Sequence, residues 1–353
     1  MTTTALQLDT GSSDLWAITD QCTTNTCSQL SPVTHQLASK GLNLTETRVE
    51  LHFGDSATGT SANGTVAVDT VTLAGIAIPN QAFGAVDETT LSIVQSGAAG
   101  VLGLGFPTGS RIQAALANAT TSDAYFRDTS RSGPILSRIL MSNVLRMPMF
   151  TVELQRSMID ADEGSAAHGQ LTVGRMPDDL QATKSEVLWV PVKLYKPEEG
   201  GFNAPSFAKG KVYPLRWEIE IEGVFFDGQR VDESKISADS TLPTPTRNKT
   251  FALVDTGNSQ LRGPRDVVDN ILDRASMTYQ PGVMNSAEFP CLESKKLEFQ
   301  IGGQASLTSC STLRFLELTF LFVRQCRGFP STHETLSVNH AREIRRHVSP
   351  MSW

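Results

Sequence analysis

Two short stretches decide how this chain folds: DTGSSDL at Asp9–Leu15 and DTGNSQL at Asp255–Leu261. Five of their seven positions are identical, and the two copies lie 246 residues apart. Each follows an apolar stretch, Leu6 and Leu8 in the first case and Phe251–Val254 in the second. Each copy is therefore predicted to be a strand that runs into a tight glycine turn and presents an aspartate. A single Asp-Thr-Gly is common in β-turns, but two copies with matching flanks, one in each half, indicate a shared role.

The chemistry suggested by the repeat is that of a carboxyl pair, Asp9 and Asp255. Two carboxyls held a few ångström apart cannot both ionise, because like-charge repulsion raises one pKa, so the pair shares a proton over an acidic range. One carboxyl is then a base that deprotonates a water, and the other is an acid that hydrogen-bonds a substrate carbonyl. The holder of the shared proton is left unassigned, because a coupled pair titrates as a unit. Simple turn capping by the two aspartates is the alternative that the matched flanks disfavour.

Composition sets the outer limits of the interpretation. The chain has 353 residues, of which 39% are hydrophobic and 19% charged, and its length suggests two domains of roughly 150 residues each. A net charge of −7 argues against a nucleic-acid partner. No apolar run approaches the ~20 residues that a membrane span needs. The six histidines form no HExxH and no metal-ligand spacing, so we expect neither a metal nor a cofactor.

Local patterns predict a mostly β chain, because short runs rich in Val, Thr, Leu and Phe alternate with Gly, Asn and Pro. The predicted strands include residues 65–73, 149–154, 170–173 and 217–224. A helix is expected over 265–277, where apolar residues recur at helical spacing after Gly263-Pro264. Residues 196–210 and 237–249 are predicted to be surface loops. Four sequons, at Asn43, Asn63, Asn118 and Asn248, are weak evidence for secretion.

Over roughly residues 6–304, the chain resembles the pepsin-like aspartic peptidases, and we expect a fungal-type branch. Residues 9–16 and 254–257 resemble the two catalytic loops, and 49–55 resemble the strand that leads into the flap hairpin. The other matching segments, in the family's order, are 69–73, 80–84, 101–105, 169–174, 189–192 and 263–264. Of these, 101–105 resembles the hydrophobic-hydrophobic-Gly segment that threads behind the first catalytic loop.

The resemblance implies an all-β, bilobal fold with the active-site cleft between two β-barrel-like lobes. The N-terminal lobe would span 1–174 and carry Asp9 and the flap, and the C-terminal lobe would span 175–310 and carry Asp255. It also implies an aspartic endopeptidase that hydrolyses internal bonds of polypeptide substrates at acidic pH as a monomer. A secreted or vacuolar location is expected, although the start of the chain, MTTTALQL, lacks the pattern of a signal peptide.

The resemblance also implies a role for each residue around the dyad. Thr10 and Thr256 would hydrogen-bond to the opposite loop and fix the spacing, and Gly11 and Gly257 would let backbone approach the carboxylates. Ser12 would donate to the outer oxygen of Asp9. Asn258 stands where the family more often has Thr or Ser, and its amide can donate as well. Cys22 and Cys27 correspond to the family's small first disulfide.

The flap is expected at Phe53, Gly54 and Asp55, where it would close over the peptide and exclude water. Asp55 could accept a hydrogen bond from the substrate backbone. The family usually has Tyr in place of Phe53, and the missing hydroxyl cannot accept the indole N–H of Trp16. Plain core packing of Trp16 and Phe53 is an open alternative.

The ends of the chain depart from the family pattern. The basic tail, 311–353, carries six arginines, three glutamates, no lysine and no aspartate. The family's β-hairpin before the first catalytic loop and its hydrophobic-hydrophobic-Gly-Asp brace behind the second have no counterpart, the latter being missing after Gly303. An incomplete or misread gene model would produce such ends, and ends that belong to the real protein are the open alternative. In either case we expect this exact chain to fold poorly alone and to cleave little. Cys291 could pair with Cys310 or Cys326.

Two other functions fit part of the pattern. A catalytically impaired relative would bind peptides in the cleft without cutting them. An ATPase of the actin and sugar-kinase type also uses Asp-x-Gly-Ser/Thr turns, there to hold phosphate and metal. The flap-like segment, the cysteine pair and Trp16 favour the peptidase.

Overall fold

The computed structural model describes residues 3–32, 34–54, 59–117, 121–154, 170–177, 187–236, 249–258, 261–283, 295–303 and 348–352. Several sequence predictions lie outside these residues. They are Asp55 of the flap, most of the loop 237–249, the sequons at Asn118 and Asn248, the three remaining cysteines and any brace after Gly303. The lobe boundary near Gly174 stays a prediction.

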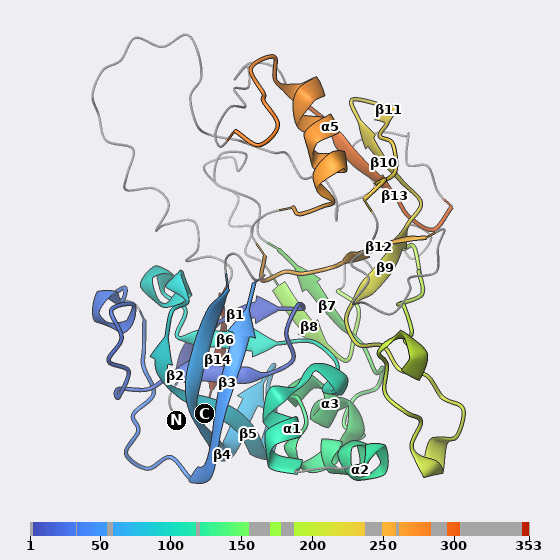
Figure 1. Ribbon diagram of the computed structural model, residues 1–353. Helices are drawn as coiled ribbons and strands as arrows, with labels where there is room; N and C mark the ends of the chain where they lie inside the picture. Colours follow the sequence, from blue (N-terminus) through green and yellow to red (C-terminus); the bar gives the residue numbers. More distant parts are fainter. Residues whose placement is uncertain are drawn as a thin grey trace, which may run out of the picture.

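The first half of the chain forms one seven-stranded sheet in the order β14-β1-β6-β2-β5-β4-β3, in the lower part of Figure 1. Its strands are β1 (Thr3–Asp9), β2 (Leu15–Ile18), β3 (Leu44–Phe53), β4 (Thr60–Leu73), β5 (Ile76–Thr89), β6 (Gly100–Gly103) and β14 (Val348–Ser352). β14 comes from the basic tail and runs antiparallel to β1, and a single bridge joins Ser352 to Thr72 of β4. The described strands form no closed barrel, but their mainly antiparallel pairing agrees with an all-β lobe.

Both faces of this sheet are buried, which explains why its central strands are apolar without alternation. In β2, Leu15 and Ala17 pack in one hydrophobic cluster with Phe83 and Leu102. Trp16 and Ile18 pack in the other, with Val101 among their partners. The whole of β2 is buried for this reason. The first catalytic loop, which connects β1 to β2, is therefore held at both ends by core strands.

Three helices cover part of this sheet and were not predicted from the sequence. They are α1 (Arg111–Ala117), α2 (Ser122–Ser132) and α3 (Ile135–Met141). The Thr121 side chain accepts a hydrogen bond from the N–H of Ala124 and so caps α2, and α3 buries Ile135 and Ile139. Short 3-10 turns lie at Cys27–Gln29, Ser92–Ser96, Pro107–Gly109, Pro197–Glu199 and Ser206–Ala208.

The strands β7 (Phe150–Glu153) and β8 (Gln170–Val173) pair with each other and pack against the core of the first half. The second half consists of small sheets and one helix, seen in the upper part of Figure 1. In it, β9 (Glu218–Ile221) pairs with β12 (Thr250–Leu253), and a three-stranded sheet has the order β11 (Gln229–Arg230), β10 (Gly223–Phe226) and β13 (Leu297–Gln300). Helix α5 spans Arg265–Ala275, which confirms the helix predicted there. The single strand predicted over 217–224 is instead two strands, β9 and β10, because each pairs with a different partner.

Packing in the described part of the second half is sparser. Its cluster of buried apolar side chains consists of Phe226, Val231, Ala275 and Leu297. Leu253 is 39% exposed and Val254 45% exposed, although both lead directly into the second DTG turn. In the first half, Leu8, which matches Val254, is buried, and Gln7, which matches Leu253, is half-buried.

A long loop, residues 193–216, runs from the second half onto the first and is called the crossing loop below. The ring of Tyr213 stacks on Phe126 of α2 with centroids 4.5 Å apart, and Phe202 lies 5.2 Å from the Tyr125 ring. The Thr108 hydroxyl donates to the carbonyl of Pro214 at 2.9 Å. These contacts attach the crossing loop to the helical layer of the first half.

Replacing Phe126 with Ala should remove the stacked ring that holds the crossing loop. We expect the free energy of unfolding to fall by about 2 kcal/mol, since burial and aromatic contact are lost together. Urea denaturation of the 353-residue chain measures this. Phe207→Ala is the matched control, because Phe207 is 54% exposed and its ring centroid lies 4.7 Å from the guanidinium carbon of Arg127, so its loss should cost well under half as much. Equal effects of the two changes would contradict this description of the loop.

Candidate active site

The two DTG turns come together between the halves of the molecule and are joined by reciprocal hydrogen bonds. The Thr10 hydroxyl donates to the carbonyl of Val254 at 2.6 Å, and the Thr256 hydroxyl donates to the carbonyl of Leu8 at 3.0 Å. The backbone N–H of each threonine donates to the other hydroxyl, at 3.1 Å and 3.0 Å. Each threonine therefore fixes the opposite loop, as the resemblance implied for these two residues.

The glycines of the two turns bring backbone against the carboxyls. The N–H of Gly11 donates to Asp9 Oδ1 at 2.8 Å, and the N–H of Gly257 donates to Asp255 Oδ1 at 2.9 Å. A methyl group added at Gly11 would lie 2.5 Å from the carboxyl carbon of Asp255, and one added at Gly257 would lie 2.5 Å from Asp9 Oδ1. Each glycine thus packs against the aspartate of the other loop, and any side chain there would push the carboxyls apart.

The electrostatics of the pair raise the pKa of Asp9 to about 6. Burial is the main cause, since Asp9 is only 7% exposed, and the charge of Asp255 and a hydrogen bond with its carboxyl add to it. The Ser12 hydroxyl, which donates to Asp9 Oδ2 at 2.5 Å, and the N–H of Gly11 work in the opposite direction. Asp9 therefore holds a proton over an acidic range in which an exposed aspartate would be ionised. Asn258, at the position that matches Ser12, is exposed.

The first loop has a backbone support behind it. β6 runs parallel to β1, the N–H of Leu104 donates to the carbonyl of Asp9 at 2.8 Å, and the N–H of Gly105 donates to that of Ser12 at 2.8 Å. Residues 101–105 thus lie behind the first DTG turn, where the resemblance placed them. On the second loop, the N–H of Val254 donates to the carbonyl of Trp217 at 2.9 Å.

The hairpin of β3 and β4 lies where the flap was expected, with Phe53 opposite Thr60 and Gly54 in a left-handed conformation at φ 82°. Phe53 is half-buried, and its ring centroid lies 6.0 Å from that of Trp16. Trp16 is fully buried, and its indole nitrogen has no hydrogen-bond partner among the described residues. A buried unpaired N–H costs about 1–3 kcal/mol.

The structure adds two residues that the sequence did not single out. Asp14 is buried and accepts hydrogen bonds from the Ser110 hydroxyl at 2.5 Å and from the N–H of Arg111 at 2.7 Å, so it ties the first loop to the start of α1. Burial raises the pKa of Asp14, and these hydrogen bonds oppose the rise. Trp217 donates its indole N–H to the carbonyl of Leu104 at 2.9 Å. The signals in the sequence were an aspartate directly before a buried strand and a tryptophan directly before another strand, and both patterns are too common to assign a role.

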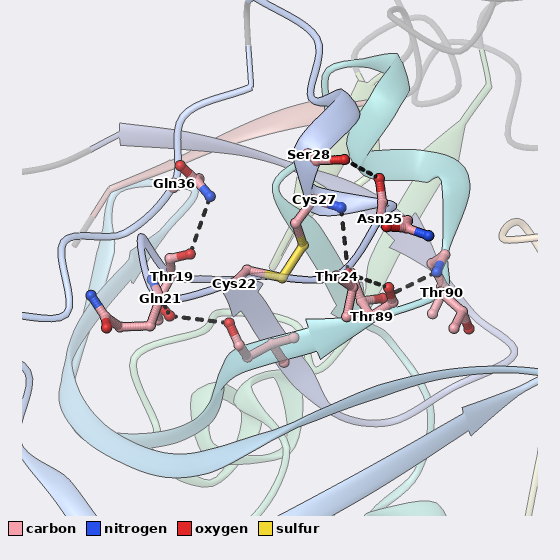
Figure 2. Close-up of a disulfide and its surroundings, with 12 residues drawn as sticks. Thr19, Gln21, Cys22, Thr24, Asn25, Cys27, Ser28, Gln36, Thr89 and Thr90 are labelled. Carbon is pink, nitrogen blue, oxygen red and sulfur yellow. Dashed lines mark hydrogen bonds between the residues drawn. A yellow bond between two sulfur atoms is a disulfide. The ribbon is translucent and has the colours of Figure 1, made fainter.

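Figure 2 shows the disulfide between Cys22 and Cys27, the pair that the resemblance implied. The Thr24 hydroxyl between them donates to the carbonyl of Thr89, so the closed turn is attached to the end of β5. The disulfide closes the loop after β2.

Within the described residues, no three or more His, Cys, Asp or Glu side chains cluster in a way that could hold a metal ion. Nor, in the same part of the chain, does any helix combine the length and apolar content that crossing a membrane requires.

Comparisons with known proteins agree with this geometry. The family of eukaryotic aspartyl proteases matches residues 2–319. Cathepsin E-B of Xenopus laevis is 27% identical over 257 residues, which are 72% of this chain and 49% of that protein. Cathepsin E of Mus musculus is 25% identical over 271 residues, covering 76% and 53%. Major aspartyl peptidase 1 of Cryptococcus neoformans is 23% identical over 303 residues, covering 84% and 52%.

The chain thus spans about half the length of the curated relatives it matches. These relatives come from vertebrates and from a fungus, so the similarity supports the family and not one branch of it. With a family match over most of its length and two crossed DTG loops in its structure, the chain belongs to the eukaryotic aspartyl proteases, the pepsin-like aspartic peptidases.

Proposed function

We propose that this chain is an aspartic endopeptidase that cleaves internal peptide bonds at acidic pH with Asp9 and Asp255 as the catalytic pair. The observation that carries the proposal is the mutual packing of the two DTG turns, which places each glycine against the other loop's carboxyl. A pKa of about 6 for Asp9 supports it, because one proton can then stay on the pair in acidic solution.

The reaction follows from that single proton. The ionised carboxyl takes a proton from a water, and the protonated carboxyl donates to the carbonyl oxygen of the scissile bond as the water attacks its carbon. The tetrahedral product then loses its amine, which leaves with a proton from the pair. In this scheme, Thr10, Gly11, Ser12, Thr256 and Gly257 hold the carboxyls, Asn258 supports the second loop, and the hairpin of Phe53, Gly54 and Asp55 covers the peptide.

A second candidate is a peptide-binding relative that cleaves poorly. Two observations favour it. The strand leading to Asp255 leaves Leu253 and Val254 exposed, and the Trp16 indole nitrogen has no hydrogen-bond partner in the part of the chain that the structure describes. A catalytic group displaced by an ångström can lose a hundredfold in rate while the cleft still binds. Measuring cleavage and binding of the same peptide separates the two candidates.

The setting of the activity is proposed from the same family membership. A disulfide is stable in oxidising compartments, so the Cys22–Cys27 bond supports a secreted or vacuolar protein. We expect a monomer, because both aspartates come from one chain, and polypeptide substrates without metal or cofactor.

Asp9→Asn and Asp255→Asn should each abolish proteolysis, because the reaction needs one base and one acid. A loss of at least a thousandfold in kcat/KM is expected, measured on an acid-denatured protein substrate. Asp69→Asn, on an exposed part of β4, is the control and should keep full activity. Substantial cleavage by either dyad variant would overturn the assignment.

The pH dependence of stability gives a readout that needs no activity. The folded pKa of Asp9, about 6, lies above its ordinary value of 3.8, so the folded state binds the proton more tightly. The stabilisation is complete below pH 4 and is lost as the pH rises through 6, by an amount on the order of 3 kcal/mol. Denaturation at pH 4 and at pH 7 should show this fall in wild type, and Asp9→Asn should flatten it. An equal slope in both proteins would contradict it.

Phe53→Tyr should supply a hydroxyl to the unpaired indole N–H of Trp16 across the 6.0 Å ring contact. We expect kcat/KM to rise about fivefold, on the order of one hydrogen bond or ~1 kcal/mol. Steady-state kinetics measures this, together with a structure of the variant. A new hydroxyl that points to solvent, with unchanged kinetics, would remove Phe53 as the cause of a loose flap.

A further inference from the structure

The side chain of Gln7 reaches from β1 to the second catalytic loop. Gln7 lies between Leu6 and Leu8, which are buried in the core of the first half, and strand alternation directs it to the opposite face. Its amide Nε2 donates to the carbonyl of Gly257 at 3.1 Å, across 250 residues of sequence. Gln7 itself is half-buried.

Gly257 contacts the carboxyls of both aspartates. Its N–H donates to Asp255 Oδ1 at 2.9 Å, and its α-carbon packs so closely against Asp9 that an added methyl would lie 2.5 Å from Oδ1. A displacement of Gly257 would therefore loosen Asp255 and change the surroundings of Asp9 together. The carbonyl of this one residue is the group that Gln7 fixes.

The two copies of the repeat differ at this point. The residue two before the first aspartate is Gln7, and the residue two before the second is Leu253. The leucine side chain has no hydrogen-bond donor, so it cannot make the matching bond to the first loop. The first loop already receives hydrogen bonds from Leu104 and Gly105 behind it. The Gln7 bond thus supports the loop whose own strand is partly exposed.

We propose that Gln7 is a positioning residue for the reaction, which holds Gly257 so that Asp255 faces Asp9. This inference rests on the proposed function, because it assigns Gln7 to the same dyad. It predicts that loss of the amide donor lowers the rate of the chemical step more than it weakens substrate binding.

The test compares Gln7→Leu with wild type by steady-state kinetics and thermal melting of the 353-residue chain. The variant installs the residue that the other copy has at the same position. We expect kcat to fall roughly threefold to tenfold, the effect of one hydrogen bond, with a smaller change in KM. Gln36→Leu is the matched control. Gln36 is also half-buried, and its amide donates to the carbonyl of Thr19 at 3.2 Å, away from both loops. The Gln36→Leu variant should change the melting temperature and leave kcat and KM unchanged.

Gln7→Met, which is closer to glutamine in shape, guards against misfolding of the leucine variant. Folded Gln7 variants with wild-type kcat would overturn the proposal, and so would loss of folding in both, because Gln7 would then serve stability only.

If wild type does not cleave, the proposed function fails separately, and the readout becomes calorimetric affinity for a peptide with a hydroxyl-bearing tetrahedral carbon in place of the scissile carbonyl. A weaker affinity in the Gln7 variants than in Gln36→Leu would support the positioning role. Equal affinities, or no binding by any of the proteins, would overturn it.

Discussion

Two groups that repel one another are held together here by four hydrogen bonds between the turns that carry them. Thr10 and Thr256 each donate and accept across the pair of loops. Bonds of this kind contribute about 1 kcal/mol each, comparable in size to the cost of pressing a buried carboxyl against another charge. The pKa of Asp9 rises to about 6 mainly because its carboxyl is buried, and the charge of Asp255 adds to the rise, so a bound proton relieves both costs.

The support behind the two aspartates is unequal. Asp9 ends a strand in a sheet that is buried on both faces, and backbone donors from β6 continue beneath its turn. The strand leading to Asp255 pairs with β9, and its last residues, Leu253 and Val254, are partly exposed. In the described part of the chain, the position of the second aspartate depends more on contacts from the first half than the reverse. Whether the chain can catalyse proteolysis therefore depends mainly on how well the second DTG turn is held in place.

The sequence predicted a structural feature correctly where the residues of one short segment are enough to specify it. The doubled DTG turn, the helix at 265–275 and the strand at 170–173 depend on local pattern, and the structure has all three. Of the helices that were missed, α1 and α3 have only seven residues each, and α1 is capped from a distance by Asp14, 97 residues before Arg111. The Gln7 bond to Gly257 joins residues 250 apart, and no local pattern could pair them. The exact geometry of the site depends on such contacts.

A second set of hydrogen bonds joins the two DTG turns, and it passes through Trp217. The indole N–H of Trp217 donates to the carbonyl of Leu104, whose own N–H donates to the carbonyl of Asp9. The backbone carbonyl of Trp217 accepts the N–H of Val254, the residue before Asp255. The ring of Trp217, directly after the end of the crossing loop, packs against the ring of Phe106 with centroids 4.2 Å apart. A motion of one half relative to the other would have to break these hydrogen bonds. The crossing loop and Trp217 therefore restrain the distance between the two DTG turns, which Thr10 and Thr256 also fix.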